Sequence, residues 1–168
     1  MEMKDIKYKW LSPRFKPPYE TEQDRKHQEN AKERLSEMWG IEIHDLYDPL
    51  YHIDWYSNSC ARPMFMEYKR KYCRILDYSW VILSLSKYMT LIQYNTHLDA
   101  GIYFICEFDD GMWYYDLSAS SNIFRPVPEL VWSGNKKRNG PGDMEPCLKL
   151  LNSNFKPVKK PNKDEQLQ

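Results

Sequence analysis

Apolar residues between Thr21 and Gly40 recur at the spacing of a single helix face. Thr21 followed by Asp24 is typical of a helix start with acids in the first turn, and Gly40 supplies a stop. We therefore predict a helix over residues 22–39. The residues that share its apolar face are Ala31, Leu35, Met38 and Trp39.

Beyond the helix the pattern changes to short alternating or apolar runs, which favour strands. The predicted strands cover residues 41–44, 51–56 and 65–71, with a turn near Asn58 between the last two. A second helix follows the apolar run at 81–83 and continues to about His97.

A β-hairpin follows the second helix. Residues 102–108 are strongly apolar, Asp110-Gly111 favours a two-residue turn, and residues 113–117 return antiparallel. Glu107 belongs to this hairpin and is predicted to be solvated.

The predicted order is helix, three strands, helix and two strands, which favours an α/β (α+β) fold with a mixed central sheet flanked by helices. Residues 1–20 are predicted to form an extended arm, because they contain three prolines. Residues 21–158 are predicted to be a single domain that ends in an irregular, proline-broken extension from residue 118. Residues 159–168 are predicted to be disordered.

The composition fits one folded domain, because 168 residues with 42% hydrophobic positions can bury a core. The formal net charge is zero, which weakens a nucleic-acid interaction without excluding it, since local clusters of positive charge matter more. In the cluster that begins at Lys69, we predict that Arg70, Lys71 and Arg74 contact DNA phosphates. The alternative is an ordinary solvated surface.

The four cysteines form no CxxC pair and are predicted to be free thiols in a reducing cytoplasm. The charged N-terminus lacks the apolar segment of a signal peptide, and no apolar run approaches membrane-spanning length. We therefore expect a cytoplasmic protein that does not enter a membrane.

Two neighbouring predicted strands carry the groups that metal-assisted hydrolysis of a phosphodiester requires. Asp54 lies in one strand, and Glu67 and Lys69 share one face of the next. Two carboxylates can hold a hard divalent cation, and a lysine beside the metal can position or deprotonate the attacking water.

The simpler alternative is that these acids are ordinary strand residues paired with Lys69 or Arg70. Glu67, however, falls in the mostly apolar run 64–68. A carboxylate there is costly unless a cation compensates its charge, which favours the metal site.

These elements together resemble the PD-(D/E)XK nuclease superfamily, in which a helix with Glu and a terminal Gly precedes an Asp strand and a Glu-x-Lys strand. More narrowly, residues 22–117 are similar to archaeal Holliday-junction resolvases and small phage endonucleases. Tyr68 departs from the pattern, because an aliphatic residue is usual between the Glu and the Lys. The phage-like segments are Met38-Trp39-Gly40, residues 83–88 and Glu145-Pro146.

The resemblance implies a restriction-endonuclease-like fold and a DNA endonuclease that uses Mg²⁺ or Mn²⁺. It implies that Asp54 and Glu67 ligate the metal, that the backbone carbonyl of Tyr68 adds a ligand, and that Lys69 acts on the water. Branched DNA as substrate, a homodimer, a phage origin and a location in the host cytoplasm are further implications.

The resemblance also assigns a role to the first helix, and the start of the second helix suggests another from its residues alone. The helical Glu of the superfamily corresponds to Glu29, with Glu33 as the alternative. Ser84 or Ser86 can cap the second helix, and Ser84 and Lys87 can meet a DNA phosphate at its N-terminus; a purely structural cap is the alternative.

A rival interpretation is a catalytically inert nuclease-like fold that acts as a binding or virion-associated protein on another phage or host protein. Zero net charge, 13 Tyr and 6 Trp residues, and arms at both ends favour it. A third interpretation is an inhibitor of a host defence protein.

Overall fold

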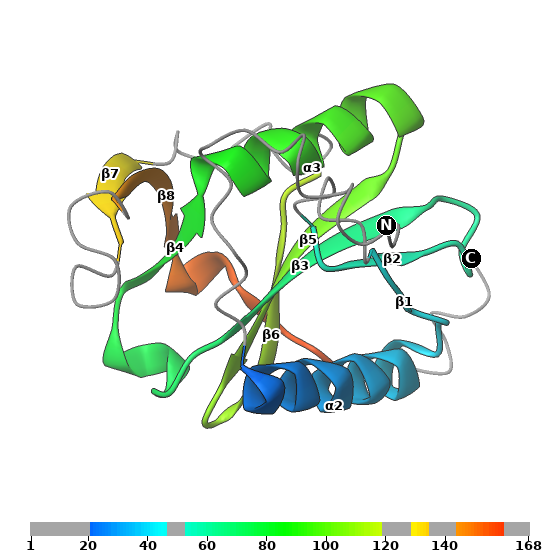
Figure 1. The fold of residues 1–168 in the computed structure, drawn as a ribbon, viewed down its shortest axis with the longest axis horizontal. Helices are drawn as coiled ribbons and strands as arrows, with labels where there is room; N and C mark the ends of the chain where they lie inside the picture. The colour runs from blue at the N-terminus through cyan, green and yellow to red at the C-terminus, as the bar shows by residue number, and fades with distance from the viewer. Residues whose placement is uncertain (1–20, 47–52, 119–128, 135–143, 160–168) are drawn as a thin grey trace, which may run out of the picture.

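The computed structural model describes residues 21–46, 53–118, 129–134 and 144–159 (Figure 1). The predicted arm over residues 1–20, the start of the second predicted strand at residues 51–52 and the predicted tail from residue 160 lie outside them. Among the described residues, no helix is both long enough and apolar enough to cross a membrane.

Within the described residues, two sheets form the framework. In this part of the chain the larger sheet has six strands in the order β1-β2-β3-β5-β6-β9, and the smaller has three in the order β4-β8-β7. Only the β3–β5 pair is parallel among the described pairings, so the larger sheet is mixed, as predicted. The bounds are β1 (His44–Asp45), β2 (Trp55–Ser57), β3 (Met64–Arg70), β4 (Trp80–Ser84), β5 (Gly101–Phe108), β6 (Gly111–Asp116), β7 (Glu129–Ser133), β8 (Glu145–Leu151) and β9 (Lys156–Pro157).

Helix α2 (Glu22–Trp39) covers one face of the larger sheet and has the predicted bounds. Thr21 and Asp24 bond reciprocally as a capping box, and Gly40 ends the helix in the left-handed conformation, with φ 66°. Ala31 and Leu35 are fully buried. They pack with sheet side chains that include Trp55, Met66 and Ile105.

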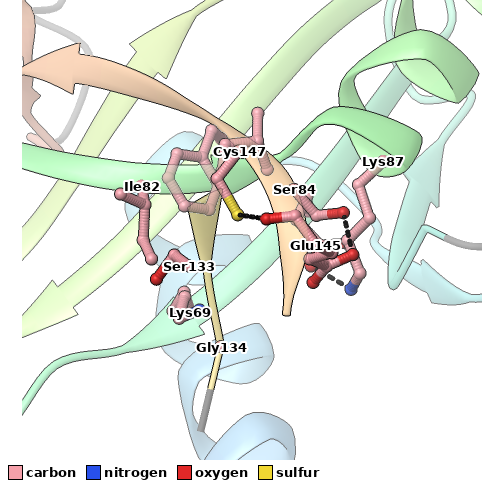
Figure 2. A pocket seen from close by; sticks show the side chains of 11 residues that line it. Lys69, Ile82, Ser84, Lys87, Ser133, Gly134, Glu145 and Cys147 are labelled. Carbon is pink, nitrogen blue, oxygen red and sulfur yellow. Dashed lines mark hydrogen bonds and ion pairs between the residues drawn. The ribbon is translucent and has the colours of Figure 1, made fainter. Parts of the chain in front are cut away.

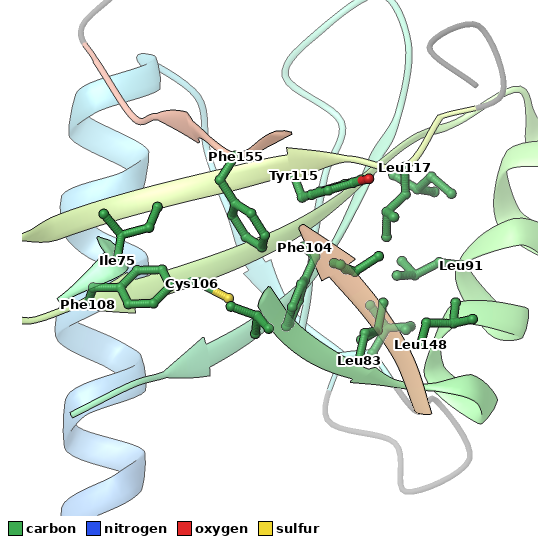
Figure 3. Close-up of a cluster of buried hydrophobic side chains, with 14 residues drawn as sticks. Ile75, Leu83, Leu91, Phe104, Cys106, Phe108, Tyr115, Leu117, Leu148 and Phe155 are labelled. Carbon is green, nitrogen blue, oxygen red and sulfur yellow. The ribbon is translucent and has the colours of Figure 1, made fainter. Parts of the chain in front are cut away.

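Helix α3 (Leu85–Leu98) and the smaller sheet cover the opposite face (Figure 1). Figure 3 shows how this core is assembled: Leu83 and Leu148 of the smaller sheet and Leu91 of α3 surround Phe104 of β5. Glu67 is paired with Phe104 in the parallel β3–β5 register. Because directly paired residues share a face, Glu67 points to the α3 side of the sheet.

The smaller sheet was not predicted. Residues 81–83 were assigned no strand, yet they lie in β4, and the extension predicted to be irregular contains β7, β8 and β9. Leu148 and Leu150 of β8 pair with Leu83 and Val81 of β4 across a long separation in the sequence. Prolines conceal the strand pattern here, because Pro disfavours a central strand and β8 begins with Glu145-Pro146.

Three local boundaries also differ. The first predicted strand shrinks to His44–Asp45, because the Glu42 N–H bonds the Ser59 hydroxyl at 2.8 Å instead of a strand. Asp54 precedes β2 instead of lying within it. The hairpin turn consists of Asp109 and Asp110, one residue earlier than predicted, since Phe108 pairs with Gly111.

Replacing Leu35 tests whether apolar packing against the larger sheet holds α2 in place. We expect Leu35→Ala to lower the free energy of unfolding by about 2–5 kcal/mol, because it leaves a cavity under the helix. Glu37→Ala, at an exposed site on the same helix, should change it by less than about 0.5 kcal/mol. Urea unfolding of both variants measures the difference, and equal losses would contradict this packing.

Candidate active site

Asp54 and Glu67 are brought together by the pairing of β2 with β3. The antiparallel register ends at the Trp55–Met66 pair, so Asp54 and Glu67 are the next residues along each segment. The Asp54 carboxylate accepts a hydrogen bond from the Tyr68 N–H at 2.8 Å, and both acids line the α2 pocket. The convergence predicted from the sequence is therefore present in the fold.

Glu67 is a buried carboxylate with one unsatisfied oxygen. Its residue is 4% exposed, its Oε1 pairs with the Lys87 ammonium, and its Oε2 has no hydrogen-bond partner among the described residues. Burial, and then the negative charge of Asp54, raise the pKa of Glu67 well above its ordinary value, although Lys87 opposes the shift. Two neighbouring carboxylates repel each other, so a cation between them would stabilise the pair.

The Tyr68 backbone faces the Asp54 side of β3. Its N–H donates to Asp54 Oδ2 at 2.8 Å, whereas the Lys71 N–H donates to Glu107 O on the other side of β3. The N–H and C=O of one strand residue point to the same side. The Tyr68 carbonyl therefore faces Asp54.

Two pockets meet at Glu67, Lys69 and Lys87, which line both. The α3 pocket has a volume of about 410 Å³ and lies between β3, the start of α3 and the smaller sheet (Figure 2). The α2 pocket has a volume of about 320 Å³ and includes Asp54. Lys69 is exposed, and shares its face of β3 with Glu67 as predicted, so its amine can reach a ligand in either pocket.

The α2 helix contributes Asp24, His27 and Gln28 to the α2 pocket. The predicted Glu29 does not line either pocket: it is exposed and pairs with Lys32 at 2.9 Å, and Glu33 is exposed as well. The sequence does contain a signal for Asp24, His27 and Gln28. Continuing the buried face of Leu35 and Ala31 toward the N-terminus at helical spacing reaches these three residues.

The predicted phosphate contacts have different environments. Arg70 pairs with Asp109 at 2.6 Å and donates to two backbone carbonyls, so structural contacts already occupy it. Lys71 is half-buried, and burial followed by the charge of Lys69 lowers its pKa. Arg74 has an exposed side chain.

Ser84 lies at the N-cap of α3, but its hydroxyl makes no capping bond. It instead bonds Glu145 Oε2 and the Ser86 hydroxyl, each at 2.8 Å, which corrects the predicted side-chain cap. Glu145 also lines the α3 pocket and was missed as a site residue, because its place depends on the unpredicted β4–β8 pair.

Glu107 anchors the face of β3 opposite Glu67, and the prediction that it is solvated was wrong. Tyr68 donates its hydroxyl hydrogen to Glu107 Oε2 at 2.6 Å, and Arg34 of α2 pairs with Oε1 at 2.5 Å. Burial alone would raise the pKa of Glu107, but these hydrogen bonds and the charges of Arg34 and Arg70 lower it below its ordinary value. The network ties the residue between Glu67 and Lys69 to α2.

The donors suit a hard divalent cation. Asp54, Glu67 and the Tyr68 carbonyl offer oxygen ligands at the α2 pocket, and Oε2 of Glu67 has no hydrogen-bond partner in the described part of the chain. No three side chains of His, Cys, Asp or Glu converge into a ready-made metal site within the described part of the chain.

Comparison with known proteins identifies the family. The family described as "Phage putative PDDEXK endonuclease" matches residues 14–158. The chain belongs to this phage PDDEXK endonuclease family. The superfamily resemblance seen in the sequence is thereby confirmed.

Comparison with solved structures adds a distant neighbour of this PDDEXK family member. The structure of Hjc, a Holliday junction resolvase from Archaeoglobus fulgidus, matches with a TM-score of 0.43 and 14% identity. The match covers 54% of this chain and 72% of that chain. No curated protein sequence matches.

Tyr68→Phe tests the Glu107 network. We expect it to lower the free energy of unfolding at pH 7 by about 1.5–3 kcal/mol, because the hydrogen bond ends on a charged group. The lowered pKa of Glu107 stabilises the fold above its ordinary pKa, and this stabilisation is lost as the pH falls through the lowered value. The penalty should therefore shrink at about pH 3.5.

Urea unfolding at both pH values measures the effect. Tyr56→Phe is the matched control, because its ring stacks near His44 outside this network. A Tyr68→Phe penalty that is absent at neutral pH, or unchanged in acid, would contradict the assigned role of Glu107.

Proposed function

We propose that this protein is a metal-dependent DNA endonuclease that hydrolyses phosphodiesters. The observation that carries the proposal is the pairing of the half-buried Asp54 with the buried Glu67 at the α2 pocket, beside which Lys69 lines both pockets. Membership of the phage PDDEXK endonuclease family supports it.

Each residue then has a defined task. Asp54, Glu67 and the Tyr68 carbonyl would hold Mg²⁺ or Mn²⁺, which supplies positive charge for the phosphate oxygens and makes water more acidic. Lys69 orients the attacking water and takes up or shares its proton. Burial limits the access of bulk water to the Glu67 carboxylate, whereas Lys69 is exposed.

The finer parts of the proposal rest on the sequence resemblance and not on the shape of the site. We propose branched DNA as the substrate, a homodimer that delivers two cuts, and a phage protein that acts in the host cytoplasm. Of the predicted basic phosphate contacts, Arg74 has an exposed side chain, and Arg70 lines the α2 pocket.

A second candidate is an inert nuclease-like fold that binds another phage or host protein, including one in the virion. The Lys87 ammonium on Glu67 favours it, because this cation already occupies a carboxylate oxygen that a metal would use. Exposed aromatic residues such as Trp132, which is 71% exposed, supply surface for a protein partner.

Cleavage assays decide between the two candidates. With Mg²⁺ or Mn²⁺ we expect nicking of supercoiled or branched DNA, and none with chelator. Lys69→Met should reduce the rate by about 100-fold or more, because it removes the group that positions the water. Asp54→Ala and Glu67→Ala should abolish cleavage.

Two exposed sites outside the pockets supply matched controls. Lys156→Met on β9 and Glu42→Ala should retain wild-type rates. If the wild-type protein neither cleaves supercoiled, branched or linear DNA nor binds Mg²⁺ or Mn²⁺, the endonuclease proposal fails and the binding protein is favoured.

A further inference from the structure

Lys87 has a different environment from the one expected of a phosphate-binding lysine. It lies in the first turn of α3, lines both pockets, and pairs with Oε1 of Glu67. The Glu67 side chain is 5% exposed, so this ion pair is closed to water on the carboxylate side. Lys69, two residues from Glu67 on the same strand, is exposed instead.

The helix itself does not favour a lysine at this place. A helix N-terminus carries partial positive charge, which attracts anions and disfavours cations in the first turn. The first turn of α3 contains no acidic residue that could offset the ammonium. The attraction that holds Lys87 must therefore come from outside the helix, and its ion-pair partner is Glu67 on β3.

The carboxylate pair requires a cation in turn. Asp54 and Glu67 line the same pocket, and Glu67 is nearly inaccessible to solvent. Two negative charges in one pocket repel each other strongly when water cannot screen them. Lys87 is the cation that contacts the buried partner of this pair.

We propose that the Lys87 ammonium is the resident counter-cation of the Asp54–Glu67 pair. It stabilises the two carboxylates in the metal-free protein, and a divalent cation displaces it from Glu67. This inference rests on the proposed metal site and adds to it an occupant that the metal must replace.

The α3 pocket offers the displaced ammonium a second position. Figure 2 shows Lys87, Ser84 and Glu145 on the same side of this pocket. The Ser84 hydroxyl holds Glu145 at 2.8 Å. A short movement of the flexible lysine side chain would therefore exchange one carboxylate for another, without leaving the charge unpaired.

Lys87→Met separates this role from an ordinary ion pair. In chelator, we expect a lower melting temperature than in the wild type, because the carboxylate pair loses its counter-cation. Without DNA, Mg²⁺ or Mn²⁺ should raise the melting temperature of Lys87→Met more than that of the wild type. The variant should bind Mn²⁺ about tenfold more tightly, since no resident charge competes.

Lys32→Met is the matched control. Lys32 is a half-buried lysine that pairs with Glu29 and Asp45 outside both pockets. Its loss should lower the melting temperature equally with and without the divalent cation, and should leave the affinity for Mn²⁺ unchanged.

A double-mutant cycle keeps the test decisive if Lys87→Met alone does not fold. In the Glu67→Gln background the carboxylate that Lys87 contacts is neutral and no longer repels Asp54, so adding Lys87→Met should cost less thermal stability than it costs in the wild type. An equal cost in both backgrounds would overturn the counter-cation role.

The affinity measurements separate the two proposals. Equal Mn²⁺ affinity in the wild type and Lys87→Met would overturn displacement while leaving the proposed metal site intact. A wild type and variant that both bind no divalent cation would overturn the metal site and the displacement together, and Lys87 would then be only a structural ion-pair partner.

Discussion

The repulsion between two carboxylates on paired strands is the constraint on which the rest of the site depends. Asp54 and Glu67 meet because β2 pairs with β3 in one register, and a slip by one residue would turn one of them to the other face. Two contacts offset the repulsion. The Tyr68 N–H donates to Asp54, and the Lys87 ammonium pairs with Glu67. Oε2 of Glu67 still has no hydrogen-bond partner among the described residues, and the proposed metal ion would supply one.

The two layers around the larger sheet explain how this arrangement persists. On one face, α2 packs through Leu35, and the Tyr68–Glu107–Arg34 network fixes the strand that carries Glu67. On the other face, α3 and the smaller sheet enclose the pocket into which Glu67 points. Rigid elements on both sides hold the acidic pair in place, because neither strand can shift without disturbing a packed core.

The sequence predicts the parts of the fold that depend on local signals. Helix α2 has its capping box and terminal Gly40, and the β2–β3 pairing brings Glu67 and Asp54 to one pocket. The smaller sheet could not be predicted in the same way, because β4 and β8 are far apart in the sequence and their pairing is a tertiary property. The contact of Lys87 with Glu67 could not be predicted for the same reason, since it joins α3 to β3.

The central claim is that one divalent cation binds between the carboxylates of Asp54 and Glu67. Anomalous diffraction from crystals of the protein grown with Mn²⁺ tests it most directly. The account predicts an anomalous peak bonded to both carboxylates, with the Lys87 ammonium withdrawn from Glu67. Crystals without a peak at this position, in which Lys87 still pairs with Glu67 at saturating Mn²⁺, would contradict it.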